Sequence, residues 1–386
     1  MFVTISRHRH VCFALLLASA SASLQADEVE KLIAIVAKAG PQGVGSAEAR
    51  RASSQLGNQG VAGLPSLLRA MDTQNIVAAN WYRTAYEAII AREAVKTKPE
   101  FPVAFFREYV RDSKRQGRPR RMVLRLLDSL TPDYRESVMP TLLEDPEFRV
   151  NAVAAVLKQG DQARADGDTD AARAKFQNAF KHTRDVAGLT AAADRLKSIG
   201  VDVNIVDHMG FVTRWYLLGP FNAPERSGFD ESYPPQQSVD LKASYTGKDG
   251  SRIAWKLYRT EDRLGQINLV QAIAQVKEAV GFAYAELDCP RNQDVQLRCG
   301  ADDNLTVWLN GEKILARRQW LNGTRLDRFN APASLKKGKN KLLVKICQGP
   351  QHKNPAVPNN WSMQLRFCDP TGRAAVFKST LPNKND

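Results

Sequence analysis

Apolar residues between positions 27 and 200 recur at i, i+3, i+4 and i+7, the spacing of one face of a helix. Because a helix with one apolar face needs a partner to bury it, these helices are expected to pack against one another. Glycine or proline residues at 40–41, 57–60, 98–99 and 131–132 interrupt the pattern where helical hairpins would turn. The pattern predicts an all-α first half, with faces such as Val29, Leu32, Ile33 and Val36; Leu64, Leu67, Leu68 and Met71; and Tyr82, Ala85, Tyr86, Ile89 and Ile90.

From about residue 211 the apolar period shortens to two, and β-branched and aromatic residues become more frequent. Asn310-Gly311 is the dipeptide that best accepts the positive φ angles of a type I′ hairpin, so a tight turn is expected there. The fold class is therefore α + β multidomain, a helical half followed by a β-sandwich of jelly-roll type. Strands are predicted at 211–218, 254–258, 281–287, 295–299, 305–309, 313–316, 341–347 and 362–367.

The first residues have the pattern of a secretory signal peptide. Arg7 and Arg9 precede the apolar run 11–18, and Ala26 provides the small residue that cleavage needs. This run is shorter than the roughly 20 residues of a transmembrane helix, and no later segment approaches that length. An exported, periplasmic or secreted protein is predicted, with a signal peptide at 1–26, helices at 27–200, a linker at 201–210, the sandwich at 211–375 and a tail at 376–386.

The chain is basic, with 55 Lys and Arg against 41 Asp and Glu and a net charge of +14. Such a balance suits an anionic partner. Export disfavours nucleic acid and leaves an acidic polysaccharide, an anionic lipid or a wall polymer. Positive charge is densest at 111–125. Gly117 and Pro119 predict that the centre of this run is a solvated, mobile loop. The candidate patch for an anionic partner consists of Arg115, Arg118, Arg120 and Arg121. No aromatic residues interleave with it, so a stacking platform for single-stranded nucleic acid is missing.

Once Cys12 is removed with the signal peptide, the four remaining cysteines all lie in the second half of the chain. Each follows an apolar run, so either a disulfide or a buried free thiol suits them, and four cysteines allow three pairings. No CxxC occurs and the histidines are scattered, which speaks against a metal site. The residues concerned are Cys289, Cys299, Cys347 and Cys368.

Four stretches resemble the galactose-binding-like jelly roll, a fold that includes the non-catalytic sugar-binding-like domain attached to many glycoside hydrolases. They are WYLLGPF at 215–221, ADDNLTVWLNG at 301–311, LKKGKNKLLVK at 335–345 and the strand 361–367. The helical half resembles HEAT-type repeats, although 160–185 is equally similar to a TPR-like hairpin. A signal peptide, a HEAT-like region and such a sandwich together resemble exported proteins of planctomycete-type bacteria. The resemblance implies the jelly-roll fold. It does not choose a function, because domains with this fold bind ligands, form dimers or separate other domains.

Asp302-Asp303 is the conspicuous acidic pair of the second half. Adjacent carboxylates suit a turn, a calcium ligand or, in the right environment, acid–base chemistry. Glycosidase carboxylates lie about 5 to 10 Å apart across a cleft, and the sequence contains no GxSxG, HExxH or Walker motif. A solvated turn is therefore expected at Asp302-Asp303. A structural calcium is the one cofactor considered. The protein is predicted not to be an enzyme.

Aromatic residues on loops are the candidate ligand contacts. An exposed indole can stack on a sugar ring while neighbouring Arg and Asn side chains donate hydrogen bonds. The alternative for each tryptophan is a core or loop anchor. The candidates are Trp320 with Arg317, Arg318 and Asn322, and Trp361. The predicted function is an exported, non-catalytic protein that binds carbohydrate, possibly an acidic glycan; the alternative is a scaffold that holds a protein partner through its helices and carries an inert sandwich.

Overall fold

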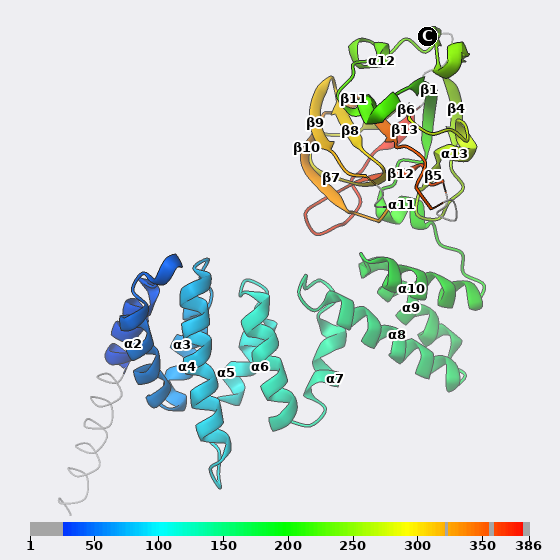
Figure 1. Ribbon diagram of the computed structural model, residues 1–386. Coiled ribbons are helices and arrows are strands. Elements are labelled where there is room, and N and C mark those ends of the chain that lie inside the picture. Colours follow the sequence, from blue (N-terminus) through cyan, green and yellow to red (C-terminus); the bar gives the residue numbers. More distant parts are fainter. Residues whose placement is uncertain (1–25, 321–322, 355–358, 381–386) are drawn as a thin grey trace, which may run out of the picture. The chain divides into compact units, whose positions relative to one another are not determined.

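The computed structural model describes residues 26–320, 323–354 and 359–380 (Figure 1). The chain divides into two compact units, Met1–Ala155 and Val156–Asp386. Helices make up the described part of the first unit, and antiparallel sheets dominate the second. The predicted α + β class, helices first and a β-sandwich after them, is therefore confirmed. HEAT-like character stays a prediction.

The helices of the first unit bury the apolar faces that the sequence pattern predicts. Leu64, Leu67 and Leu68 on α3 are almost fully buried, as are Tyr82 and Ile89 on α4. The helix α4 begins where Asn75 accepts hydrogen bonds from the next backbone N–H groups, so its first turn is capped. The elements are a helix at 26–37, η1 (Pro41–Gly43), α2 (Ser46–Asn58), η2 (Val61–Gly63), α3 (Leu64–Ala70), α4 (Ile76–Ala94), α5 (Val103–Arg111), α6 (Gly117–Leu130), α7 (Tyr134–Val138) and η3 (Met139–Thr141), and α8 (Arg149–Ala165) crosses into the second unit.

The predicted loop around Gly117 and Pro119 is wrong, because α6 begins at Gly117. A proline is tolerated in the first turn of a helix, where the backbone N–H has no acceptor within the helix and a fixed φ suits helical geometry. The basic run 111–125 therefore lies mostly on an ordered helix, which holds its side chains in fixed directions.

The second unit joins three further helices to the sandwich. These are α9 (Thr169–His182), α10 (Val186–Ser198) and α11 (Ile205–Met209), the last of which occupies the stretch predicted as a linker. The α11 residues Ile205 and Met209 share an apolar cluster with Leu189 of α10 and with Phe211 at the start of the sandwich. Short elements η4 (Pro224–Phe229), α12 (Pro234–Gln237), η5 (Lys248–Gly250) and α13 (Leu269–Ala272) lie between the strands.

Two antiparallel sheets face each other in the sandwich. The larger has the order β4-β1-β6-β11-β8-β9, with β13 also paired to β6, and the smaller has the order β10-β7-β12-β5; β2 and β3 form a separate ribbon. The strands are β1 (Arg214–Asn222), β2 (Ser244–Thr246), β3 (Arg252–Ala254), β4 (Lys256–Arg259), β5 (Ile267–Asn268), β6 (Ala279–Cys289), β7 (Gln293–Asp302), β8 (Leu305–Leu309), β9 (Glu312–Arg317), β10 (Phe329–Leu335), β11 (Gly338–Gln348), β12 (Ser362–Cys368) and β13 (Lys378–Thr380). The last of these lies in the predicted tail.

The core fills the space between the two sheets and includes Trp215, Val344 and Trp361. A second cluster, with Phe221, Trp255 and Phe282, covers the other face of the larger sheet. Because both faces of this sheet are buried, the central strand β6 is apolar at nearly every position and not only at alternate ones.

The hairpin at Asn310-Gly311 is confirmed, whereas two other details of the strand prediction are wrong. Leu309 pairs with Glu312 across a two-residue loop whose φ angles are both positive, 54° and 86°. Strand β1 continues through Gly219-Pro220, where a stop was predicted, because a shift of register between Leu218 and Phe221 accommodates the proline. The unpredicted β10 contains Pro332, which is tolerated because β10 is an edge strand.

Candidate ligand-binding site

The candidate site lies where β7 passes into β8. Asp302 is the last residue of β7, and Asp303 and Asn304 connect it to β8. All three are buried, with exposed fractions of 5%, 2% and 0%, so the prediction of a solvated acidic turn is wrong. The reason is a set of contacts with the end of β11. The Asp303 N–H donates to the carbonyl of Cys347 (3.1 Å), and the Asp303 carboxylate accepts the Gly349 N–H (2.9 Å).

The two carboxyl groups hydrogen-bond to one another. Burial, the hydrogen bond to Asp303 and the charge of Asp303 together raise the pKa of Asp302 to about 7, against the opposing effects of the Gly323 N–H and the Lys277 ammonium. Burial also lowers the pKa of Lys277, which the two carboxylates oppose. Near neutral pH the pair therefore holds a proton that exposed aspartates would have released.

A side chain from the segment after β9 fastens this turn. Gln319 donates through Nε2 to the carbonyls of Ala301 and Asp303, both at 2.9 Å, and its N–H donates to Asn304 Oδ1. Among the described residues, Asn304 Nδ2 and Gln319 Oε1 are buried without a hydrogen-bond partner. Buried polar atoms usually have a partner, so this donor and this acceptor, beside the carboxyl pair, are left uncompensated within the described chain.

Trp320 lies at the edge of the same site. A Cβ built on Gly349 would lie 2.9 Å from Asp303 Oδ2 and 3.0 Å from the Trp320 ring, so the bare backbone of Gly349 lets both approach. The Arg226 guanidinium lies 5.0 Å from the Trp320 ring centroid, a cation–π contact. Trp320 is half-buried. The structure thus brings a carboxyl pair, two unpaired amide atoms and an aromatic face together.

The other predicted ligand contacts have different positions. Arg318 is exposed, pairs with Asp230 and lies 4.8 Å above the Phe229 ring. Arg317 is exposed at the end of β9, and Asn322 is outside the described residues. Trp361 is 0% exposed and packs between the two sheets, so its predicted role as a ligand contact is corrected to a core residue.

Sequence reasoning did not identify Gln319, Asn304, Arg226 or Lys277 as part of this site. One signal in the sequence pointed to it. Three consecutive polar residues, Asp302 to Asn304, interrupt two strands that are otherwise apolar on their inner face, and such residues become buried if the strands remain paired. Arg226 and Lys277 belong to distant segments, and only the folded chain places them near the pair.

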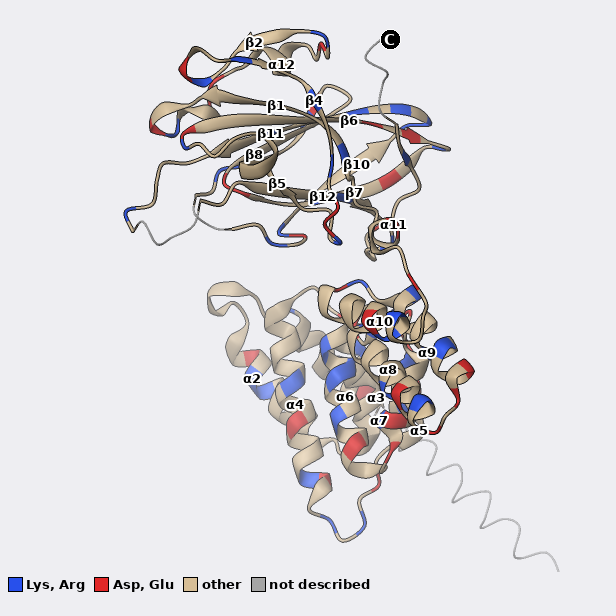
Figure 2. Ribbon diagram, turned by 90° about the vertical axis from the view of Figure 1, so that its right-hand side faces the viewer, with Lys and Arg blue, Asp and Glu red and all other residues tan. Residues whose placement is uncertain are grey.

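The predicted basic patch is largely neutralised by acids within its own unit. Arg115 donates to Asp72 (2.8 Å) and Asp112 (3.0 Å). Arg120 is 1% exposed and pairs with Asp145, while Arg121 pairs with Glu147. Of the four predicted residues, Arg118 and Arg121 are exposed, and Arg121 is paired with Glu147. Figure 2 shows blue and red segments interspersed along these helices, so the prediction of a solvated basic loop is wrong.

The four cysteines are buried free thiols, and burial raises the pKa of Cys299 and of Cys347 to about 12. Within the described ranges, no group of three or more His, Cys, Asp or Glu side chains could hold a metal ion. None of the described helices is both long and apolar enough to cross a bilayer. The predicted signal peptide lies almost entirely outside the described residues.

No protein-family model and no curated protein matches the chain. Solved structures resemble part of it. The β-glucosidase of Kluyveromyces marxianus, in complex with glucose, is 11% identical over 40% of this chain and 16% of the enzyme, with a TM-score of 0.25. The PA14 sugar-binding domain of an RTX adhesin is 11% identical over 44% of this chain and 96% of that domain, with a TM-score of 0.23.

The GH31 α-xylosidase of Xanthomonas citri is 10% identical over 41% of this chain and 16% of the enzyme, with a TM-score of 0.20. The chain thus spans less than a quarter of the length of the two glycosidases. A helical region followed by a β-sandwich is established, and membership of the galactose-binding-like family stays a prediction.

Proposed function

We propose that the β-sandwich binds carbohydrate at Asp302, Asp303 and Trp320 and catalyses no reaction. The observation that carries this proposal is the buried carboxyl pair beside a half-buried indole. Carboxyl groups accept hydrogen bonds from sugar hydroxyls, and the face of an indole suits the apolar face of a sugar ring. The amide atoms Asn304 Nδ2 and Gln319 Oε1 supply one further donor and one further acceptor.

The arrangement of the two carboxyl groups favours binding over hydrolysis. A glycosidase needs about 5 to 10 Å between its carboxyl groups to hold the sugar, and a water molecule where configuration inverts. Asp302 and Asp303 instead hydrogen-bond to each other. The proposal rests on these residues and not on the partial likeness to glycosidases and to the adhesin domain.

Charge directs the proposal towards acidic sugars. Arg226 is exposed and lies over the Trp320 ring, so a carboxylate or sulfate on a bound sugar would meet a guanidinium at the rim of the site. The net charge of +14 adds a long-range attraction for such polymers. Export through the N-terminal signal peptide, to the periplasm or the exterior, would bring the protein to them.

A glycan array at low salt, with neutral, uronic-acid and sulfated sugars, tests this proposal. We expect binding that weakens about tenfold or more in Trp320→Ala and in Asp303→Asn, because each removes a direct contact. Trp81→Phe, a tryptophan change in the helical unit, is the control and should bind normally. Arms with CaCl2 and with EDTA separate direct contacts from contacts made through a cation.

Three outcomes would count against the proposal. An array without any bound glycan would overturn it, as would binding that Trp320→Ala and Asp303→Asn leave unchanged. Release of reducing sugar from a bound glycan, lost in Asp302→Asn, would contradict the non-catalytic role.

A further inference from the structure

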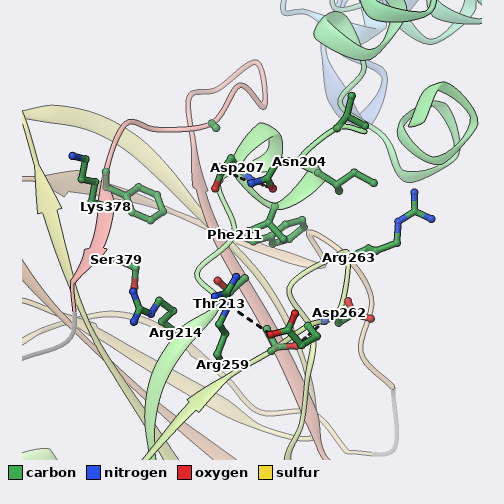
Figure 3. A pocket seen from close by; sticks show the side chains of 18 of the residues that line it. Asn204, Asp207, Phe211, Thr213, Arg214, Arg259, Asp262, Arg263, Lys378 and Ser379 are labelled. Atoms are coloured by element: carbon green, nitrogen blue, oxygen red, sulfur yellow. Dashed lines mark hydrogen bonds and ion pairs between the residues drawn. The ribbon is translucent and has the colours of Figure 1, made fainter. Parts of the chain in front are cut away.

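A cavity of about 1120 Å³ opens in the second unit, beside the starts and ends of several strands (Figure 3). Strand β1 pairs with β6 over Ala279–Tyr284, and β13 pairs with β6 over Glu286–Asp288. The end of β13 therefore meets the start of β1 along the same edge of β6. The cavity lies at this junction. It is lined by Thr213 and the first residue of β1, by the end of β4 and the residues after it, by the segment that leads into β13, and by α11 with the residues before it.

Two arginines lie opposite each other at this junction. Arg214 on β1 and Arg259 on β4 are directly paired across the antiparallel strands, and both are exposed. Like charges in such a pair destabilise a sheet. The nearest carboxylate to Arg259 is Glu261 at 3.7 Å, with both side chains largely exposed, and such a contact contributes little. The side chain of Arg214 makes no hydrogen bond or ion pair with any residue in the described part of the chain.

The same cavity has further donors. Lys378 and Ser379 of β13 line it, and Figure 3 shows Ser379 and Arg214 on the same side. Ser379 Oγ is buried and has no hydrogen-bond partner among the described residues. Burying a hydroxyl without a hydrogen-bond partner costs free energy, and a molecule bound in the cavity could supply the missing hydrogen bond.

Two of the acids that line the cavity are engaged locally. Asp207 accepts a hydrogen bond from Asn204 Nδ2 (2.6 Å). The Asp262 carboxylate accepts the N–H groups of Leu264 (2.8 Å) and Gln266 (3.1 Å). Asp202 also lines the cavity and is exposed. The cavity is thus lined by both acidic and basic side chains, but none of these acids pairs with Arg214.

We propose that this cavity binds an oxyanion, a phosphate, sulfate or carboxylate group, between Arg214 and Arg259, with Ser379 Oγ as a further donor. Guanidinium groups bind such anions through paired N–H donors, and an anion between two arginines replaces their repulsion by attraction. The site shares none of its residues with the proposed sugar site, and its test is separate from that one.

Isothermal titration of the full chain with inorganic phosphate, sulfate and acetate, at low ionic strength, tests the proposal. We expect at least one of the three to bind with a stoichiometry of one. Arg214→Gln and Arg259→Gln should each weaken binding about tenfold or more, since each removes a charged donor. Ser379→Ala should cause a smaller loss. Circular dichroism would verify that each variant is folded.

Arg291→Gln is the matched control, because Arg291 is exposed on the β6–β7 connection and does not line the cavity. It should leave the affinity for each anion unchanged. The proposal is overturned if none of the three anions binds, if Arg214→Gln binds as well as the parent chain, or if Arg291→Gln loses as much. The rank of phosphate, sulfate and acetate identifies which oxyanion the cavity prefers.

Discussion

Two groups of arginines in this molecule differ in what surrounds them. The run containing Arg115, Arg120 and Arg121 is the densest positive charge in the sequence, yet each of these residues pairs with an acid in the folded helical unit. Arg214 and Arg259 are far apart in the sequence and inconspicuous there, yet the sheet places them opposite each other with little compensation. Available charge therefore depends on which residues the fold brings together and only weakly on density along the chain.

The buried ion pair shows how strongly the first group is fixed. Arg120 donates through Nε to the carbonyl of Val110 (3.0 Å) and through Nη1 to Asp145 (3.1 Å), and its guanidinium lies 4.8 Å from the Phe148 ring centroid. These contacts join α5, α6 and the segment before α8. A guanidinium held in this way serves packing and is unavailable to an external anion.

The largest expected effect comes from breaking this pair. Arg120→Ala leaves Asp145 buried without its cation, which should lower the free energy of unfolding by about 3 to 5 kcal/mol. Urea unfolding followed by circular dichroism at the helical band measures the loss. Arg121→Ala is the control; its side chain is 56% exposed, so a loss below about 1 kcal/mol is expected. Equal losses in the two variants would show that burial does not distinguish these arginines.

The local parts of the fold could be predicted from the sequence. The Asn310-Gly311 turn depends on the φ angles that these two residues accept, and the apolar helix faces depend on a period of 3.6 residues. The strand β10 was not predicted, because it contains Pro332 and a proline is compatible with a strand only at the edge of a sheet. Which strand lies at an edge depends on the pairing of strands that are distant in the sequence.

The candidate site was less predictable for the same physical reason. Asp302 and Asp303 were recognised as a pair, but their burial depends on Cys347 and Gly349, which pack over them from β11 and the residue after it. Trp320 and Trp361 are both tryptophans beside Asn or Gln in the sequence. The pairing of β12 with β7 and β5 places Trp361 inside, whereas Trp320 lies at the edge of the site beside Arg226.

Asp302 and Asp303 are a second pair of like charges, but unlike Arg214 and Arg259 they are buried. A bound proton reduces the repulsion between the two carboxyl groups. The pKa of Asp302 rises from its ordinary 3.8 to about 7, so between these pH values the folded state binds more protons than the unfolded state. Stability should therefore fall as pH rises through this range, by up to about 1.4 kcal/mol per pH unit. Urea midpoints measured across the range would reveal the slope.

Asp302→Asn places a neutral amide where the proton was held and should flatten this slope. Asp288→Asn, at an exposed position on β6, should leave the slope as it is in the parent chain. A slope that persists unchanged in Asp302→Asn would assign the pH dependence to other groups and remove the evidence for a shared proton.

The smallest expected effect concerns the arginine pair and has the opposite sign to that of Arg120→Ala. Without an oxyanion, Arg214→Gln removes a like-charge contact and should raise the free energy of unfolding by about 0.2 to 1 kcal/mol at low ionic strength. Added NaCl should shrink the gain, since both side chains are exposed to screening. Arg259→Gln should give a similar gain, and the double variant little more than either one, because one repulsive contact is removed only once. Fully additive gains would mean that Arg214 and Arg259 do not repel each other, and the difference between the two groups of arginines would then be one of burial alone.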